Sequence, residues 1–116
     1  MDTKNAALAF KALAQPTRFA AFRRLVAAGP EGLAAGDLAA ALDVPHNTLS
    51  AHLAVLRRAG LAAARDRGRT RRYAIDAAGM RALTRFLMAD CCGGRPEICA
   101  PAGALFEPIP SNGDRR

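Results

Sequence analysis

Leucine spacing between residues 35 and 60 constrains the fold of this chain more than any other feature. Apolar side chains recur at helical intervals on both sides of a three-residue break that contains Pro45. Gly60 then marks a helix stop. Two helices are predicted, over residues 35–42 and 45–59, with their buried sides formed by Leu38, Leu42, Leu49, Leu53 and Leu56. Helices this close together indicate a helix-turn-helix unit.

The flanking segments predict three more helices and a hairpin. Helices are expected over residues 4–14, 17–28 and 76–90, with Asp76 as the cap of the last. Two short runs around Gly68 predict a β-hairpin over residues 61–75, and residues 31–33 are expected to be a linker. The large side chains expected to be buried are Leu8, Phe10, Leu13, Phe19, Phe22, Leu25, Val26, Met80, Leu83 and Leu87, with Arg18, Arg23 and Arg24 facing outward. The chain is therefore predicted to be mainly α with a small β-hairpin.

The length and composition favour a single folded unit with a thin core. The 116 residues are 51% hydrophobic, but alanine supplies much of that fraction. A core with few large side chains gains from a partner subunit, so dimerisation is expected. We expect residues 1–90 to form the folded domain and residues 91–116 to be a cysteine-containing segment followed by a flexible tail.

Positive charge is concentrated on one short stretch of the chain. The formal net charge is +7. Residues 57–72 hold one aspartate, Asp66, and seven arginines, hence six of the seven net positive charges: Arg57, Arg58, Arg65, Arg67, Arg69, Arg71 and Arg72. Guanidinium groups suit the phosphates and guanines of a polyanion, although a solvated basic face is the plainer alternative.

The sequence also carries expectations about the cell compartment. It has no run of about 18 apolar residues that could cross a bilayer, so no membrane association is expected. The start, Met1-Asp2-Thr3-Lys4, lacks the charged-then-apolar order of a signal peptide. A cytoplasmic protein is expected.

Polar residues near the start of the 45–59 helix suit the reading of duplex DNA. A major groove admits one helix, which must be held from behind by apolar residues while short polar side chains reach base edges. The residues predicted to contact DNA are His46, Asn47, Thr48, Ser50, Arg57, Arg58, Arg67, Arg69 and Arg71. For His52, on the same helix, packing or a hydrogen bond within the helix is expected rather than a DNA contact.

The three cysteines, Cys91, Cys92 and Cys99, fall within nine positions. An odd number does not suit a disulfide framework, and a reducing compartment would keep the thiols free. Gly93-Gly94 permits a reversal that brings the third sulfur toward the first two. Three thiolates suit trivalent arsenic or antimony, whereas structural zinc usually takes four ligands. Zn²⁺, Cd²⁺, Cu⁺, a redox pair and incidental thiols remain open as alternatives.

Taken in order, these segments resemble the ArsR/SmtB family of winged-helix repressors. The resemblance covers roughly residues 6–89 and rests on four runs: Gln15-Pro16-Thr17-Arg18, residues 37–42, residues 47–61 and Arg67-Gly68-Arg69. It implies a winged helix-turn-helix fold, and homodimers on palindromic operators with the first and last helices in the dimer contact. The cysteine and Asp/His sensing sites of some members have no counterpart here, but the C-terminal cysteine trio resembles that of arsenic-responsive members.

Together these features predict a dimeric DNA-binding repressor that leaves its operator when arsenite or antimonite binds Cys91, Cys92 and Cys99, with no organic cofactor. The nearest rival senses Zn²⁺, Cd²⁺ or oxidation instead. A metal-sequestering protein that binds no DNA is a third reading. Catalysis is not expected, because no acid partner or oxyanion donor accompanies the cysteines.

Overall fold

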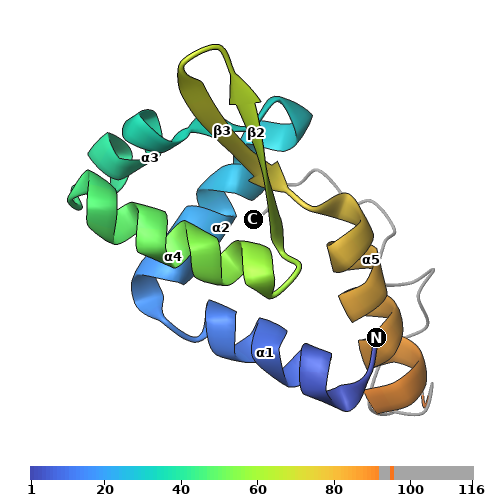
Figure 1. Cartoon of the computed structure of the whole chain (residues 1–116). Helices are drawn as coiled ribbons and strands as arrows, with labels where there is room; N and C mark the ends of the chain where they lie inside the picture. The colour runs from blue at the N-terminus through green and yellow to red at the C-terminus, as the bar shows by residue number, and fades with distance from the viewer. Residues whose placement is uncertain (92–94, 96–116) are drawn as a thin grey trace, which may run out of the picture. The chain divides into compact units, whose positions relative to one another are not determined.

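The computed structural model describes residues 1–91 and residue 95, with backbone alone for residues 90 and 91. The chain divides after Leu83, and the first unit, Met1–Leu83, carries the helix-turn-helix and the sheet (Figure 1). The elements in order are α1 (Thr3–Leu13), α2 (Pro16–Ala28), the 3₁₀ turn η1 (Gly29–Glu31), β1 (Leu33–Ala34), α3 (Ala35–Leu42), α4 (His46–Arg58), β2 (Ala62–Arg67), β3 (Thr70–Ile75), α5 (Ala77–Arg85) and the π-helical η2 (Phe86–Cys91). The mainly helical fold with a small sheet is confirmed.

The helix-turn-helix is formed by α3 and α4. Helix α3 ends where Asp43 adopts a left-handed φ of 55°, and the Val44 N–H donates to the Ala39 carbonyl at 3.1 Å. Pro45 is the N-cap residue of α4 rather than a residue of its first turn. Leu38 of α3 is fully buried, as are the three leucines predicted for α4, Leu49, Leu53 and Leu56. The bounds of α3 match the prediction, and those of α4 differ from it by one residue at each end.

The wing, which we define as β2, β3 and the Gly68-Arg69 loop between them, belongs to a larger sheet than the sequence predicted. The two strands pair antiparallel, and β1 pairs with the other edge of β3, giving the order β1-β3-β2. Leu33, expected in a linker, lies opposite Tyr73. The linker prediction was wrong at this residue because a two-residue strand is too short to show any period.

Helix α2 buries only Leu25 of the large side chains predicted for its core, and α1 buries none of its large side chains fully. Alanines form the buried face of α1, and Ala21 and Leu25 form that of α2. Most of the large side chains assigned to this core are partly or largely exposed: Leu8 45%, Phe10 43%, Phe19 47% and Val26 55%, with Leu13 and Phe22 intermediate. Alanine faces let helices approach closely, so volume alone did not identify the inner side. The apolar side chains left outside form a surface on α1 and α2.

The last helix begins as predicted and ends differently. The Asp76 carboxylate accepts from the Gly79 N–H at 3.0 Å, which confirms it as the cap of α5. Leu83 is buried, whereas Met80 and Leu87 are only partly buried. From Phe86 the chain turns π-helical instead of continuing as an α-helix to residue 90. No helix of the described residues is long and apolar enough to cross a membrane.

Gly32, between η1 and β1, offers a stability test. Its φ is +68°, and a Cβ there would collide with the backbone carbonyl oxygen of Tyr73. Gly32→Ala should lower the free energy of unfolding by at least about 2 kcal/mol, because it adds left-handed strain to this overlap. Urea unfolding at fixed protein concentration measures the change.

Gly36, inside α3, is the matched control. A Cβ there would meet nothing within 4 Å, so Gly36→Ala should raise stability by up to about 1 kcal/mol through helix propensity. Equal effects of the two substitutions would contradict the packing described for β1 and β3.

Candidate nucleic-acid interface

The start of α4 presents short polar side chains from a rigidly held helix. His46, Asn47 and Thr48 are exposed and Ser50 is half-buried, while the opposite side of the helix is fully buried. The Asn47 side-chain oxygen accepts from the Thr48 N–H at 2.9 Å, which leaves its amide nitrogen to donate outward. All four residues were predicted to contact DNA, and the structure brings them together at one helix end.

The backbone at this helix end also favours an anion. Pro45 provides no side-chain cap, and the first turn of α4 holds no acidic residue. Apart from the Thr48 N–H, which donates to Asn47, the first N–H groups and the positive end of the helix dipole are therefore open to a phosphate.

Arg57 and Arg58 lie at the other end of the same helix. Both are exposed in its last turn. With a rise of 1.5 Å per residue, the two ends of α4 are roughly 18 Å apart. A helix lying in a groove would therefore bring the polar start to the bases and these arginines to phosphates at the rim.

Strand alternation divides the arginines of the wing between two faces. In the register, Arg65 lies opposite Arg72 and Arg67 opposite Thr70, so these side chains share one face of the hairpin. Asp66 and Arg71 form a pair on the other face. Arg67 directly precedes the loop and Arg69 lies in it, and both are exposed.

Arg71 is held by neighbours within the wing. Its Nη1 lies 3.0 Å from the Asp66 carboxylate, and its Nε donates to the Tyr73 hydroxyl at 3.1 Å. The guanidinium carbon is 5.7 Å from the centre of the Tyr73 ring. The hydrogen bond to Tyr73 and, less strongly, the charge of Asp66 raise the pKa of Arg71 above its ordinary value. Arg71 is thus a less available phosphate ligand than Arg67 or Arg69.

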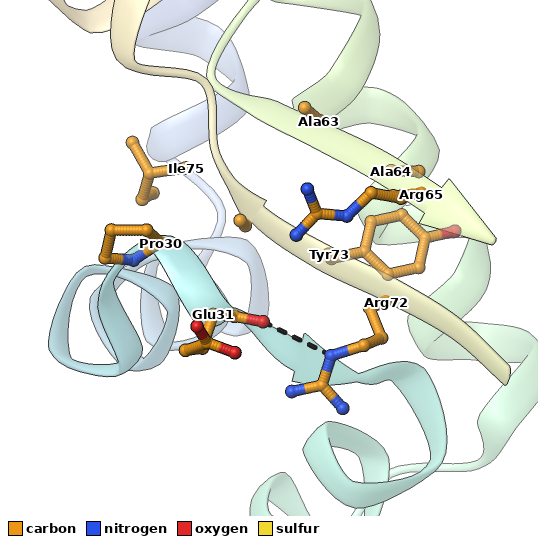
Figure 2. A pocket seen from close by; sticks show the side chains of 9 residues that line it. Pro30, Glu31, Ala63, Ala64, Arg65, Arg72, Tyr73 and Ile75 are labelled. Carbon is orange, nitrogen blue, oxygen red and sulfur yellow. Dashed lines mark hydrogen bonds between the residues drawn. The ribbon is translucent and has the colours of Figure 1, made fainter. Parts of the chain in front are cut away.

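Arg72 has a structural role that sequence reasoning missed. Its Nε donates to the Glu31 carbonyl at 3.2 Å and its Nη2 to the Gly32 carbonyl at 3.0 Å. Figure 2 shows the bond from Arg72 to Glu31, two of the residues that line a cavity of about 310 Å³, with Arg65 on the neighbouring strand. The contact joins β3 to the corner before β1. Only the pairing of those strands reveals it, and the pairing is not visible in a local pattern.

Arg18, predicted to face outward, instead turns into the junction of three helices. Its Nε donates to the Ala12 carbonyl of α1 at 2.7 Å, and its Nη1 lies 3.2 Å from Nδ1 of His52 on α4. His52 was expected either to pack or to form a hydrogen bond within its helix; its hydrogen bond instead joins it to α2, and the packing alternative is not contradicted. The guanidinium is drawn inward because the Ala12 carbonyl has no helical partner: the residue four positions later is Pro16, which has no N–H.

The predicted thiol site falls largely beyond the residues that the structure describes. Cys91 is the last residue of η2, and Cys92 and Cys99 lie outside the described residues. Within residues 1–91, no three His, Cys, Asp or Glu side chains gather closely enough to hold a metal ion. The three-thiolate site stays a prediction.

The chain has a helix-turn-helix whose apolar side is buried, a reading helix with an exposed polar start, and a basic wing. These features define a winged-helix protein of the class that binds duplex DNA. A family described as "Helix-turn-helix domain" matches residues 13–63. Comparison with curated proteins gives no match.

Several solved structures of transcriptional regulators are similar to this chain. A structure described as a possible transcriptional regulator for arsenical resistance is 33% identical, covers 69% of this chain and 83% of its own, and has a TM-score of 0.56. An ArsR-like regulator from Rhodococcus sp. RHA1 is 25% identical, with 91% of this chain and 96% of its own covered and a TM-score of 0.68. Mb0332 of Mycobacterium bovis is a winged helix-turn-helix domain described as homodimeric and as a possible ArsR-family regulator. It is 29% identical, with 79% of this chain and 85% of its own covered and a TM-score of 0.59. The chain therefore has a winged helix-turn-helix fold and is similar in sequence and structure to ArsR-family transcriptional regulators.

Removing the two arginines at the tip of the wing, neither of which has a side-chain hydrogen bond or ion pair among the described residues, tests the interface. Arg67→Ala with Arg69→Ala should weaken binding to all duplex sequences and make log K fall less steeply with log salt, by about 2 units of slope. Fluorescence anisotropy across a salt series measures both effects.

Arg23→Ala with Arg24→Ala is the matched control, because these exposed arginines of α2 carry the same charge outside the candidate interface. An equal change of slope in the control would show that net charge, not the wing, sets the affinity.

Proposed function

We propose that this protein is a homodimeric repressor that holds an operator in double-stranded DNA and releases it when trivalent arsenic or antimony binds Cys91, Cys92 and Cys99. The observation that best supports the DNA-reading part is the two-sided character of α4. Its apolar side is fully buried, whereas His46, Asn47 and Thr48 are exposed next to an uncapped helix start. This division is what a groove-reading helix needs.

In this proposal the two parts of the interface do different work. Asn47, Thr48 and Ser50 carry both donors and acceptors, so they suit base edges and set sequence preference. Arg67 and Arg69 carry charge at a short loop, so they suit phosphates and set affinity. Changes at Thr48 or Ser50 are expected to alter the choice among operators, unlike changes in the wing.

The proposed dimer rests on the apolar side chains that α1 leaves outside. Leu8 and Phe10 are each more than two-fifths exposed. The related M. bovis domain is described as homodimeric, and the family resemblance places the first and last helices in the dimer contact. Two copies would present two α4 helices to successive half-sites on one face of the DNA, about one helical turn apart.

The proposed inducer rests on the chemistry of the donor set. Three thiols are soft ligands, which disfavours Mg²⁺, Ca²⁺ and Mn²⁺, and their number suits an ion that takes three sulfurs. The relative described as a possible regulator for arsenical resistance supports the same choice. Cys91 stands at the end of η2, where i→i+5 bonding replaces the regular α-helix.

Within the first unit, one contact could transmit a change from the last helix to the reading helix. The Asp76 N–H donates to the Leu61 carbonyl at 3.0 Å, and Gly79 packs so closely on the Gly60 carbonyl that a Cβ would collide with it. Gly60 and Leu61 directly follow the C-cap of α4. We propose that ligand binding at Cys91, Cys92 and Cys99 alters the end of the last helix. Through the contact with Gly60 and Leu61, this change alters the orientation of α4.

Titration of operator-bound protein with arsenite tests the sensor. Arsenite should weaken operator binding by about 5- to 150-fold, the usual range of allosteric coupling, and Cys91→Ser, Cys92→Ser or Cys99→Ser should each abolish the response. Anisotropy reports DNA release, and ultraviolet absorption reports the arsenic–thiolate bonds.

Ala89→Ser is the matched control, because it adds the same side chain beside the trio and removes no thiol. Unchanged DNA binding at saturating arsenite would eliminate the sensor but leave the DNA reader standing. Release by Zn²⁺, Cd²⁺ or an oxidant in its place would identify the rival function.

Charge placed on α1 tests the dimer. Leu8→Glu with Phe10→Glu should yield monomers, because paired carboxylates cannot be buried in an apolar contact without a large desolvation cost. Sedimentation velocity measures the oligomeric state. Val26→Glu, at a 55% exposed position on α2, is the control and should leave the dimer intact. Dissociation by the control alone would place the contact on α2.

A further inference from the structure

The Arg18 side chain connects three helices at one point. It extends from the first turn of α2, donates through Nε to the Ala12 carbonyl of α1 at 2.7 Å, and reaches the Lys11 carbonyl through Nη2 at 3.5 Å. Its Nη1 lies 3.2 Å from Nδ1 of His52, in the middle of α4. The backbone N–H of Arg18 itself donates to the Gln15 side chain, which fixes the corner from which it extends.

The chemistry of the two partners fixes the protonation state that this contact requires. A guanidinium group has only donors and stays charged at all physiological pH values. Nδ1 of His52 must therefore be the acceptor, so the imidazole must be neutral with its proton on Nε2. A protonated imidazole would offer a second donor and a second positive charge at the same distance, and the hydrogen bond would be lost.

Nothing in the described residues compensates such a charge. Helix α4 packs against α1, α2, α3 and β2. No hydrogen bond or ion pair in residues 1–91 joins His52 to a charged residue other than Arg18. The charged residues of those four elements are Lys4, Lys11, Arg18, Arg23, Arg24, Asp37, Arg65, Asp66 and Arg67. A cavity of about 460 Å³ beside Arg18 is lined by Lys11 and Arg58 and by no carboxylate.

We infer that Arg18 is a positioning residue of the reading helix, and that it holds α4 only while His52 is neutral. Histidine side chains exchange their proton between about pH 5 and 8. Protonation of the His52 ring breaks the contact, so α4 loosens and operator affinity falls as pH falls. This inference rests on the proposed role of α4 in reading DNA.

Nitrogen NMR of the free protein tests the contact without DNA. The two histidines of the chain, His46 and His52, are assigned by single substitution, and the ring ¹⁵N shifts give the tautomer. His52 should be almost entirely in the Nε2–H form at about pH 8, and Arg18→Lys should lower this fraction toward that of an exposed histidine, since an amine on a flexible stem does not reproduce the guanidinium fork. An Nδ1–H form of His52 in the unsubstituted protein would overturn the inference.

Operator binding between about pH 8 and pH 5.5 tests the consequence. His46 is exposed at the start of α4, where protonation favours phosphate, so the two histidines have opposite effects on the pH profile. His46→Asn should reveal the His52 effect alone, a loss of affinity of about tenfold toward low pH, which is the usual contribution of one hydrogen bond to a charged group.

His52→Asn is the decisive variant, because its side-chain oxygen can take the place of Nδ1 and does not titrate. Combined with His46→Asn, it should bind operator with no fall toward low pH. A tenfold fall that persists in this double variant would overturn the inference. If the protein binds no duplex at any pH, the proposed function fails, while the tautomer measurement still decides the Arg18–His52 contact.

Discussion

The burial of leucine side chains on one side of α4 is the constraint on which the rest of the structure depends. Leu49, Leu53 and Leu56 are fully buried, and each contributes roughly 1.5–3 kcal/mol relative to an exposed position. Because this side cannot turn outward without losing that free energy, the polar side of the helix is fixed toward solvent. The exposed start of α4 is therefore a consequence of the packing behind it, and its rigidity is what a base-reading surface requires.

In the wing, the alternation of a two-stranded hairpin separates arginines that the sequence presents as one cluster. Arg72 completes the junction with the η1 corner, and Arg71 is held by Asp66 and Tyr73. Arg67 and Arg69 have no such partners among the described residues. Charge density alone could not have made this distinction, because it depends on which strand lies opposite and on which face each side chain emerges.

Sequence reasoning succeeded where a local pattern decides the structure. The α3–α4 unit and the Asp76 cap follow from spacing and capping chemistry within a few residues. It failed where the partner is distant in sequence: β1 exists because β3 offers an edge, and Arg18 points inward because α1 ends with carbonyls to satisfy. The burial of large side chains on α1 and α2 was overestimated because close packing selected alanine over larger side chains.

The interactions that fix α4 in place differ in strength, and that difference indicates where regulation can act. Exposing the buried leucine side of α4 to water would cost several kcal/mol, which is more than the roughly 1–3 kcal/mol of a typical allosteric coupling. The hydrogen bond between Arg18 and His52 and the contact of Gly79 with the Gly60 carbonyl are smaller, and they lie at the middle and at the end of the helix. In the proposed mechanisms a ligand or a proton shifts α4 by altering one of these two contacts, while the leucines keep the helix folded against the core and the change reversible.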